Sequence, residues 1–333
     1  MNKILSVIIP SYNIEQYIGQ CLDSFVLPSV MKDIEILVIN DGSKDTTPQL
    51  AKKYEQKYPD IFKVIDKENG GHGSTINKGI EIATGKYFKV VDGDDWVLEE
   101  GFINLVNYLK QVDDDIVFHN YLWVNAATGQ TKHEFEEPFK GVQYRHSYTF
   151  DEIADSLYLK MHGMTYRTTL LREHQIRLDE HRFYVDTEYV LLPIPFVNKI
   201  SFLQDDVYMY RLGIDGQSMN IKSMQKNISH HLGVLDTLLN YYANLSSEDI
   251  SAPKLRYMER GIGRILSSQF KIYLSLPISK AVKLDMITLD SKIKIQYPNI
   301  YQAVINKSVW LLRKSHYSLY GIAARVLQKR LGL

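Results

Sequence analysis

The stretch Tyr87-Phe88-Lys89-Val90-Val91-Asp92-Gly93-Asp94-Asp95, residues 87–95, joins a short apolar run to three carboxylates. An apolar run of this length before a polar cluster is typical of a buried strand. Carboxylates this close together repel one another unless a cation lies between them. Mg²⁺ or Mn²⁺ is commonly shared between protein carboxylates and substrate phosphates. The pattern also fits an acidic helix start, so its interpretation as a cation site depends on the neighbouring segments.

Three further apolar runs upstream also end in polar clusters, and residues with helical spacing separate them. Regular alternation of strands and helices over the first 120 residues predicts an α/β fold with a parallel sheet covered on both faces. Ligands of such sheets bind beyond the carboxyl ends of the strands. The sequence therefore predicts one site, formed by the clusters Pro10-Ser11-Tyr12-Asn13, Asn40-Asp41-Gly42-Ser43-Lys44-Asp45, Asn69-Gly70-Gly71-His72-Gly73-Ser74 and Asp92-Gly93-Asp94-Asp95.

Two of these clusters have alternative interpretations. Asn-Asp-Gly-Ser at residues 40–43 is typical of a turn, although the carboxylate of Asp41 at a strand end can also accept a hydrogen bond from a base N–H. The glycines around Gly71 allow the backbone to approach a phosphate or sugar closely. His72 is either a ligand contact or a solvated loop histidine.

The composition limits the class of protein. The 333 residues carry 39 basic and 39 acidic side chains, so the formal net charge is zero and nothing indicates nucleic acid as a partner. Cys21 is the only cysteine, which excludes an intrachain disulfide and fits a reducing compartment. The sequence shows no signal-peptide pattern and no apolar run near the roughly 18 residues of a membrane span. We therefore expect a cytoplasmic protein, either free or peripheral at the inner face of the membrane.

The character of the chain changes near residue 220. Residues 151–212 mix helices with short strands, whereas the later residues repeat apolar side chains at helical spacing. Helical segments are predicted over 222–245, 253–276 and 300–330. We predict two domains, a catalytic α/β domain over 1–220 and a helical C-terminal domain over 221–333.

The four polar clusters, in this order, resemble the signature of the family-2 glycosyltransferases of the GT-A fold. This group includes bacterial transferases that make capsule, exopolysaccharide, protein-linked glycans and wall teichoic acid. The resembling residues are 7–13, 40–43, 69–71 and 92–96, and a weaker similarity continues to about residue 218. The resemblance implies an inverting, metal-dependent enzyme that moves a hexose or N-acetylhexosamine from a UDP-sugar to a lipid-linked, protein-linked or polymeric saccharide acceptor.

The resemblance also assigns residues to the nucleotide. Pro10 and Tyr12 would lie against the base, Asp41 would accept a hydrogen bond from uracil N3–H, and Asn69 would add a base contact. Gly71 belongs to the loop that approaches the phosphates and the sugar.

At the metal, the resemblance makes Asp92 and Asp94 the two acids of the DxD motif. Asp94 would contact Mn²⁺ or Mg²⁺ directly, and Asp92 would contact the ribose or the metal. Many family members carry an arginine after the glycine loop, where this chain reads Thr75-Ile76-Asn77-Lys78-Gly79. Either Lys78 or His72 would supply the missing positive charge.

An inverting displacement needs a general base, because the acceptor hydroxyl loses its proton as it attacks the anomeric carbon. The family's base lies at a helix start in the second half, where this chain reads Phe183-Tyr184-Val185-Asp186-Thr187-Glu188-Tyr189. The resemblance assigns the base to Asp186. The alternatives are that Asp186 only caps the helix, or that Glu188 is the base. Arg211 and Ser218 resemble the family's residues that touch the diphosphate.

Two other functions stay open from the sequence. The chain is either an enzyme or a catalytically silent subunit that binds a sugar nucleotide or serves assembly. A sugar nucleotidyltransferase shares the sheet and the metal but begins with a glycine- and arginine-rich loop, which differs from Pro10-Ser11-Tyr12 here. The same residues exclude a dinucleotide-binding dehydrogenase, which needs Gly-x-Gly-x-x-Gly after its first strand.

Residues 291–333 contain eight Lys or Arg and no Asp or Glu, and this asymmetry predicts a partner. Apolar residues over 309–331 recur at helical spacing. They either pack against the catalytic domain or a sister subunit, or form an interfacial helix on anionic lipid. We expect a homo-oligomer through the C-terminal helices, with some peripheral membrane contact.

Overall fold

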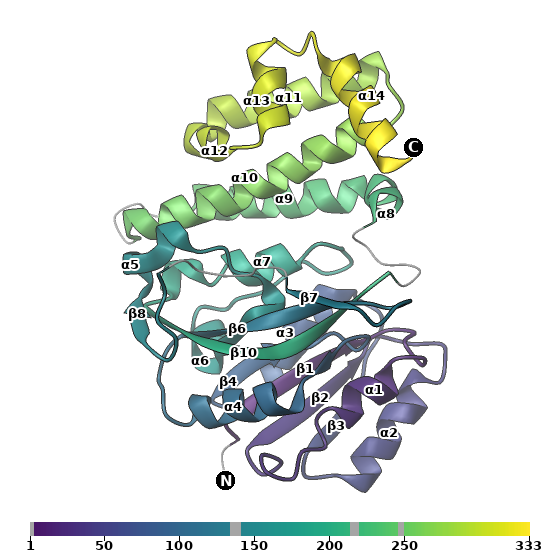
Figure 1. Cartoon of the computed structure of the whole chain (residues 1–333), viewed down its shortest axis with the longest axis vertical. Coiled ribbons are helices and arrows are strands. Elements are labelled where there is room, and N and C mark those ends of the chain that lie inside the picture. The colour runs from purple at the N-terminus through teal and green to yellow at the C-terminus, as the bar shows by residue number, and fades with distance from the viewer. Residues whose placement is uncertain (1–2, 134–140, 214–219, 246–249) are drawn as a thin grey trace. The chain divides into compact units, whose positions relative to one another are not determined.

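The computed structural model describes residues 3–133, 141–213, 220–245 and 250–333. The chain divides into two compact units, Met1–Asp215 and Gly216–Leu333 (Figure 1). The first unit contains every described strand, and the second is helical.

The described strands of the first unit form one sheet with the order β3-β2-β1-β4-β9-β6-β10-β5, to which β7 and β8 are added at β6 and β10. The strands are β1 (Leu5–Ser11), β2 (Ile34–Asn40), β3 (Phe62–Asp66), β4 (Tyr87–Val90), β5 (Trp96–Val97), β6 (Ile116–Asn125), β7 (Thr131–His133), β8 (Ser147–Thr149), β9 (Met164–Arg167) and β10 (Lys199–Leu212).

The sheet is mixed, so the prediction of a parallel sheet is only partly right. β1, β2, β3 and β4 pair in parallel, as expected. β9 lies between β4 and β6 and is antiparallel to both of them. The apolar pattern of a short strand carries no information about its direction, and this strand joins the sheet from far along the chain.

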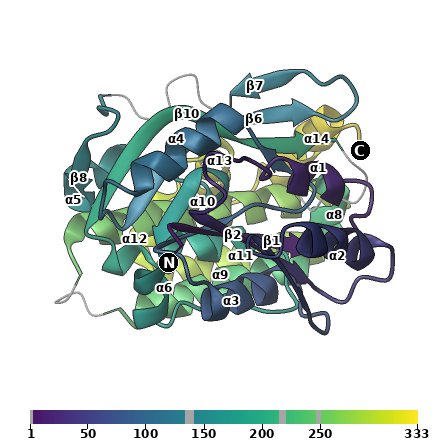
Figure 2. The same cartoon turned by 90° about the horizontal axis from the view of Figure 1, so that it is seen from below.

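Helices cover both faces of this sheet, as the sequence predicted (Figure 2). The helices of the first unit are α1 (Ile18–Asp23), α2 (Thr47–Lys57), α3 (His72–Ile82), α4 (Glu99–Leu109), α5 (Phe150–Ile153), α6 (Thr168–Glu173) and α7 (Asp186–Leu191), with 3-10 turns η1 (Ala154–Ser156), η2 (Met161–Gly163) and η3 (Ile194–Phe196).

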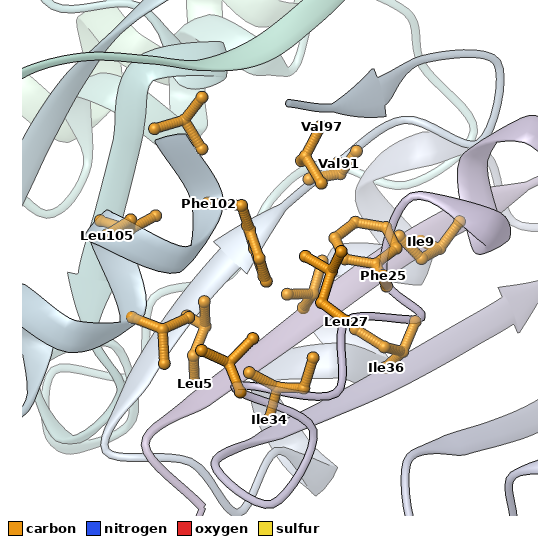
Figure 3. Packing of buried hydrophobic residues seen from close by; sticks show 14 of the residues in the cluster. Leu5, Ile9, Phe25, Leu27, Ile34, Ile36, Val91, Val97, Phe102 and Leu105 are labelled. Atoms are coloured by element: carbon orange, nitrogen blue, oxygen red, sulfur yellow. The ribbon is translucent and has the colours of Figure 1, made fainter. Parts of the chain in front are cut away.

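Alternate residues of β1 pack on opposite faces of the sheet, because successive side chains of a strand point in opposite directions. Leu5 and Ile9 belong to the large core cluster together with Phe25 and Phe102 (Figure 3). Ile8 faces the other way and lies against Gly79 of α3. Burial on both sides explains why the strand is continuously apolar.

The second unit contains seven described helices, which are α8 (Ile221–Lys226), α9 (Ile228–Ala243), α10 (Ala252–Ser275), α11 (Lys280–Gln296), α12 (Pro298–Ala303), α13 (Lys307–Lys314) and α14 (Tyr320–Leu331). The sequence analysis missed α11, which buries few side chains along its length. It also predicted one helical segment over 300–330, where the structure has three short helices. Asn306 explains one break, because its side chain caps α13 by accepting from Ser308 N and Val309 N.

None of the described helices combines the length and the apolar character that crossing a bilayer requires.

Candidate active site

The loops that follow β1, β2 and β4 meet at the carboxyl edge of the parallel strands. Asp41 N donates to Ser11 O at 2.9 Å, and Gly93 N donates to Pro10 O at 3.2 Å. Pro10 is buried, whereas the neighbouring Tyr12 side chain is 51% exposed. The structure therefore brings these strand ends together and leaves one aromatic ring accessible beside them.

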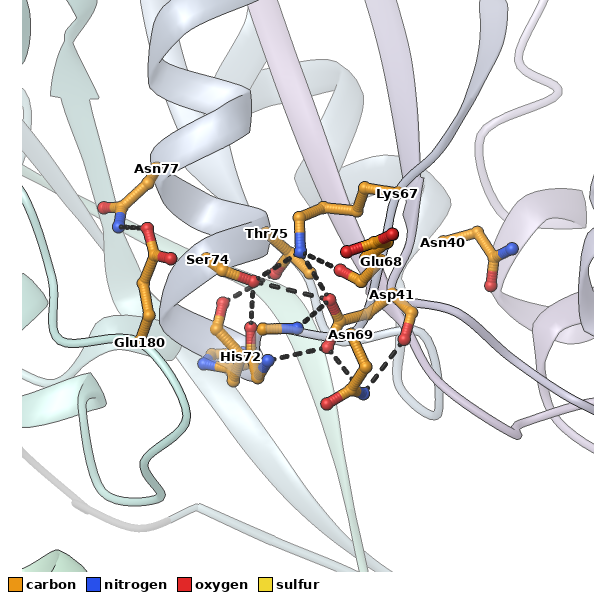
Figure 4. Close-up of polar contacts among 12 residues, drawn as sticks. Asn40, Asp41, Lys67, Glu68, Asn69, His72, Ser74, Thr75, Asn77 and Glu180 are labelled. Carbon is orange, nitrogen blue, oxygen red and sulfur yellow. Dashed lines mark hydrogen bonds and ion pairs between the residues drawn. The ribbon is translucent and has the colours of Figure 1, made fainter.

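The carboxylate of Asp41 holds the glycine loop in place (Figure 4). Its Oδ1 accepts from Lys67 Nζ at 2.7 Å and from Gly70 N at 2.9 Å. Its Oδ2 accepts from Asn69 Nδ2 at 3.0 Å and from Gly71 N at 2.8 Å. Gly71 needs to be glycine here, because its φ is +83°. Asp41 is buried, and these four donors occupy the acceptor positions of its carboxylate.

The first turns of α3 dock against a segment from the second half of this unit. Asn77 Nδ2 donates to Leu178 O at 2.9 Å, and Leu178 N donates back to Asn77 Oδ1 at 2.9 Å. A Cβ at Gly73 would lie 2.1 Å from the backbone oxygen of Asp179. The absent side chain at this position allows the two segments to pack in direct contact, and the second segment leads directly into α7.

Substituting Gly73→Ala tests this docking. Overpacking a tight contact typically costs about 1–3 kcal/mol, and here the opposing atom belongs to the backbone and cannot rotate away. We expect a lower melting temperature in thermal unfolding followed by circular dichroism. Gly19→Ala is the matched control, because a Cβ there meets nothing within 4 Å. An unchanged melting temperature in Gly73→Ala would contradict the close approach.

The three acids after β4 are held in different ways. Asp92 Oδ1 pairs with His72 Nε2 at 2.8 Å. Asp95 is buried and accepts from Tyr208 Oη at 2.5 Å and from Arg211 N at 2.7 Å. Burial and the two neighbouring carboxylates raise the pKa of Asp95 well above its usual range.

Asp94 is the least compensated of the three acids. In the described part of the chain, no other side chain donates a hydrogen bond to its carboxyl. Desolvation, followed by the charge of Asp92, raises the pKa of Asp94 to about 6. Arg211 holds the turn through the backbone, because its Nε donates to Asp94 O at 2.7 Å and its guanidinium lies 4.6 Å from the centre of the Trp96 ring. Ser218 lies outside the described residues.

Of the two residues considered in place of the family's arginine, His72 is the one that reaches the acids. Lys78 Nζ instead pairs with Glu81 at 2.7 Å on the surface of α3. Burial opposes a charge on His72, but the carboxylate of Asp92 outweighs it and raises the pKa of the imidazole.

His162 joins this group, although the sequence analysis did not find it. One of its ring nitrogens and one carboxylate oxygen each from Asp92 and Asp95 all lie within 4.8 Å of one another. Desolvation lowers the pKa of His162 to about 4, so the imidazole is neutral at pH 7. His162 lies 70 residues after the acids in a segment without a motif, and only the sheet, through β9, brings it here.

Asp186 and Glu188 have opposite environments in α7. The Asp186 side chain is reached by solvent at the first residue of the helix, and partial desolvation by surrounding protein raises its pKa. Glu188 is fully buried, and its Oε2 accepts from Asp179 N at 2.7 Å. Burial raises the pKa of Glu188 to about 8, so this group is protonated at neutral pH. Glu188 therefore supports the docked segment and does not face the acids.

The environment of Glu188 predicts a pH-dependent stability. The folded-state pKa of about 8 lies above the ordinary value of 4.5, so folding becomes less favourable as the pH rises from about 4.5 towards 8. Glu188→Gln keeps an oxygen for Asp179 N and carries no titrating group. We expect this variant to gain melting temperature relative to the wild type at pH 8 and to gain little or nothing at pH 5. An equal difference at both pH values would contradict the raised pKa.

Comparison with known proteins identifies the family and the fold. Residues 6–175 match the model of glycosyl transferase family 2. GlyA from Streptococcus pneumoniae is 28% identical over 219 residues, which cover 62% of this chain and 30% of GlyA. The poly(ribitol-phosphate) beta-glucosyltransferase of Bacillus spizizenii is 30% identical over 223 residues, which cover 65% of this chain and 33% of that enzyme. This chain therefore matches about a third of the length of these relatives.

The crystal structure of S. aureus TarS 1-349 in complex with UDP-GlcNAc superposes with a TM-score of 0.67 and 20% sequence identity, covering 98% of this chain and 89% of that one. The fold is thus the GT-A fold with a C-terminal helical region, as predicted. Because the family model spans half of the chain, the chain belongs to glycosyl transferase family 2.

Proposed function

We propose that this chain is an inverting, divalent-metal-dependent glycosyltransferase that transfers a hexose or N-acetylhexosamine from a UDP-sugar to a saccharide acceptor. The observation that carries the proposal is the cluster of three acids after β4, in which Asp92 pairs with His72 at 2.8 Å. The negative charge of Asp186 also contributes to raising the pKa of His72. A solvent-accessible carboxylate beside acids that can hold a cation is what our proposed displacement at an anomeric carbon requires. TarS was crystallised with UDP-GlcNAc, so UDP-N-acetylhexosamines are the first donors to test.

The nucleotide would bind beside Tyr12, whose exposed ring offers a stacking face for the base. The acceptor positions of Asp41 are filled, so a uracil N3–H has to replace one donor. Asn69 is the exposed donor of the four, and its amide also bonds the backbone oxygen of Asp41 at 2.9 Å. In our proposal the Asn69 amide turns toward the base, and N3–H takes its place on Asp41 Oδ2.

The residues after β4 fit a divalent cation, since three carboxylates lie within four residues and two of them have raised pKa values. In our proposal Asp92 and Asp94 hold Mn²⁺ or Mg²⁺ together with the diphosphate. The bound ion offsets the charge that develops on the departing UDP. Arg211 keeps the Asp94 backbone in position and adds positive charge on the same side.

Asp186 would act as the general base. The acceptor oxygen forms a bond to the anomeric carbon, the bond from that carbon to the UDP oxygen breaks, and the hydroxyl proton passes to the Asp186 carboxylate. Attack from the side opposite UDP inverts the anomeric configuration. A raised pKa suits this role, because a base is most efficient when its pKa lies near the working pH.

The proposed function is tested by UDP release from a panel of UDP-sugars in the presence of Mn²⁺. Asp186→Asn keeps the size of the side chain but cannot accept the proton. We expect turnover to fall by about 10²–10⁴, with UDP affinity by calorimetry nearly unchanged. Glu188→Gln is the matched control, and its turnover should stay near that of the wild type.

Each other outcome selects a different function. UDP binding without turnover of any donor would favour the silent sugar-nucleotide-binding subunit. Pyrophosphate release from a sugar phosphate and UTP would favour the nucleotidyltransferase. Full turnover in EDTA would remove the metal from the proposal, and near-normal turnover of Asp186→Asn would remove this base.

We also propose that α14 contacts an anionic membrane surface. Ile322 and Val326 of α14 are exposed by 59% and 64%, and their spacing of four residues places them on one side of the helix. Arg325, Lys329 and Arg330 are exposed on the same side or at its margins. An apolar stripe flanked by basic side chains is the pattern of an interfacial helix. If two copies of this face paired, basic side chains would lie opposite basic side chains and repel one another.

Arg313, counted among the basic residues of the tail in the sequence analysis, does not belong to this surface. It forms a buried ion pair with Asp290 at 2.7 Å, and its guanidinium lies 3.5 Å from the centre of the Tyr301 ring. Asp290 precedes the acid-free stretch by one residue, so the count of charges gave no sign of this pairing.

Changing Arg325, Lys329 and Arg330 together to Gln tests the lipid contact. Each basic residue near an anionic surface contributes about 1 kcal/mol, so we expect roughly a hundredfold weaker binding in vesicle sedimentation with phosphatidylserine-containing vesicles. Neutral phosphatidylcholine vesicles should bind both proteins weakly.

The control changes the same charge elsewhere in the second unit, by converting the exposed Lys271, Lys280 and Lys294 to Gln. This control should retain most of the vesicle binding, and an equal loss would show that only net charge matters. The homo-oligomer stays a prediction, and light scattering of the full chain tests it by measuring the molar mass in solution. A stable oligomer that dissociates in the α14 variant would assign this face to a second copy.

A further inference from the structure

The group Asp92, Asp95 and His162 has the dimensions of a single metal site. Its three ligand atoms lie within 4.8 Å of one another. Hard divalent cations bind oxygen at about 2.0–2.6 Å, so two ligands of one ion are separated by at most about 4–5 Å. Asp95 already accepts two hydrogen bonds, but each carboxylate oxygen has a second lone pair.

The imidazole of His162 is otherwise unused. In the described part of the chain, no hydrogen bond reaches either ring nitrogen, and Nδ1 is fully buried. Leaving a buried polar atom unpaired costs about 1–3 kcal/mol, and a ligand bound to the imidazole would offset this cost. The ring lies beside Asp92, which pairs with His72, and beside Asp95, whose pKa is raised by burial and the neighbouring carboxylates.

Aromatic rings hold this imidazole in one orientation. His162 stacks on Tyr210 with ring centres 4.3 Å apart and meets the edge of Tyr208 at 5.1 Å. Tyr121 lies on a third side, with ring centres 5.4 Å apart. Since Tyr208 also donates to Asp95, the same side chain fixes a carboxylate and the imidazole relative to each other.

A buried lysine fixes the backbone of the same segment. Lys89 is fully buried, and its Nζ donates to His162 O at 2.9 Å and to Met164 O at 3.3 Å. Lys89 belongs to β4 and precedes Asp92 by three residues, so it ties η2 to the strand that carries the acids. Burying a lysine without a carboxylate is costly, and here it fixes the distance between the histidine and the acidic cluster.

We propose that His162, through a ring nitrogen, and Asp95 join Asp92 and Asp94 as ligands of the divalent cation, and that Lys89 positions His162. This inference rests on the proposed function, because it names a ligand of the metal invoked there. Imidazole suits transition-metal ions, and carboxylates suit Mg²⁺ and Mn²⁺ alike. A mixed site of this kind therefore favours Mn²⁺ over Mg²⁺.

Pulsed electron paramagnetic resonance of the Mn²⁺-loaded full chain with UDP tests nitrogen ligation directly. We expect a ¹⁴N coupling in the wild type that is absent in His162→Ala and retained in His133→Ala, a histidine that pairs with Asp206 instead. Free Mn²⁺ measured by room-temperature resonance should show roughly 10–100-fold weaker binding in His162→Ala. Mg²⁺ affinity, measured by competition, should change much less.

The remaining outcomes separate this inference from the proposed function. Mn²⁺ bound without nitrogen coupling in the wild type overturns the histidine ligand and leaves a metal-dependent enzyme. A coupling that persists in His162→Ala and disappears in His72→Ala assigns the nitrogen to the other histidine and also overturns it. Because absence of nitrogen coupling in the wild-type spectrum overturns the inference by itself, poor folding of a variant does not protect the inference.

The role of Lys89 is tested by Lys89→Met, which keeps the length of the side chain but donates no hydrogen bond. We expect the preference for Mn²⁺ over Mg²⁺ to fall toward that of His162→Ala. A folded Lys89→Met protein with wild-type preference would show that the lysine is only structural. Absence of any Mn²⁺ binding by the wild type, together with UDP-sugar turnover in EDTA, would refute the metal site altogether.

Discussion

The constraint on which the site depends is the mutual repulsion of three carboxylates placed within four residues at the end of β4. Each of these acids has been given a different environment. A histidine pairs with Asp92, and a tyrosine and a backbone amide donate hydrogen bonds to Asp95. For Asp94, desolvation and the charge of Asp92 raise the pKa of the carboxyl. The compensation inside the protein is incomplete, as the raised pKa values of Asp94 and Asp95 show. An incompletely neutralised cluster of this kind is prepared for a cation, because the energy of bringing the charges together has been provided by the fold.

The docking of α3 on the second half of the unit connects this cluster to the segment that carries the proposed base. The glycine loop is fixed from one side by Asp41 and from the other by the backbone near Asp179. His72 begins the same helix and reaches Asp92, while the docked segment continues into α7 with Asp186. Two parts of the chain more than 100 residues apart thus pack together. The distance between the acidic cluster and the proposed base Asp186 depends on the close backbone contact at Gly73.

The sequence was sufficient wherever the signal was local. Apolar runs closed by polar clusters located β1 to β4 and their edge, and the motif at residues 92–95 marked the acids. The sequence was insufficient for residues whose interaction partners lie far along the chain. Nothing near His162 or Lys89 distinguishes them, because their meaning arises only when β9 inserts beside β4. Arg313 shows the same limit, since its burial against Asp290 is decided by packing of α11 and α13 and not by the charge of the tail.

Asp186 and Glu188 show most directly how environment assigns chemistry to identical functional groups. Residues two apart on a helix lie about 200° from each other, so one can face solvent while the other faces the interior. The Asp186 carboxyl remains in contact with water and its pKa is raised by desolvation. The buried Glu188 carboxyl remains protonated at neutral pH and is a hydrogen-bond partner for the backbone. Sequence similarity favoured Asp186 as the base but kept Glu188 as an alternative. Their depth in the fold separates them, because desolvation shifts a pKa in proportion to the water that is lost.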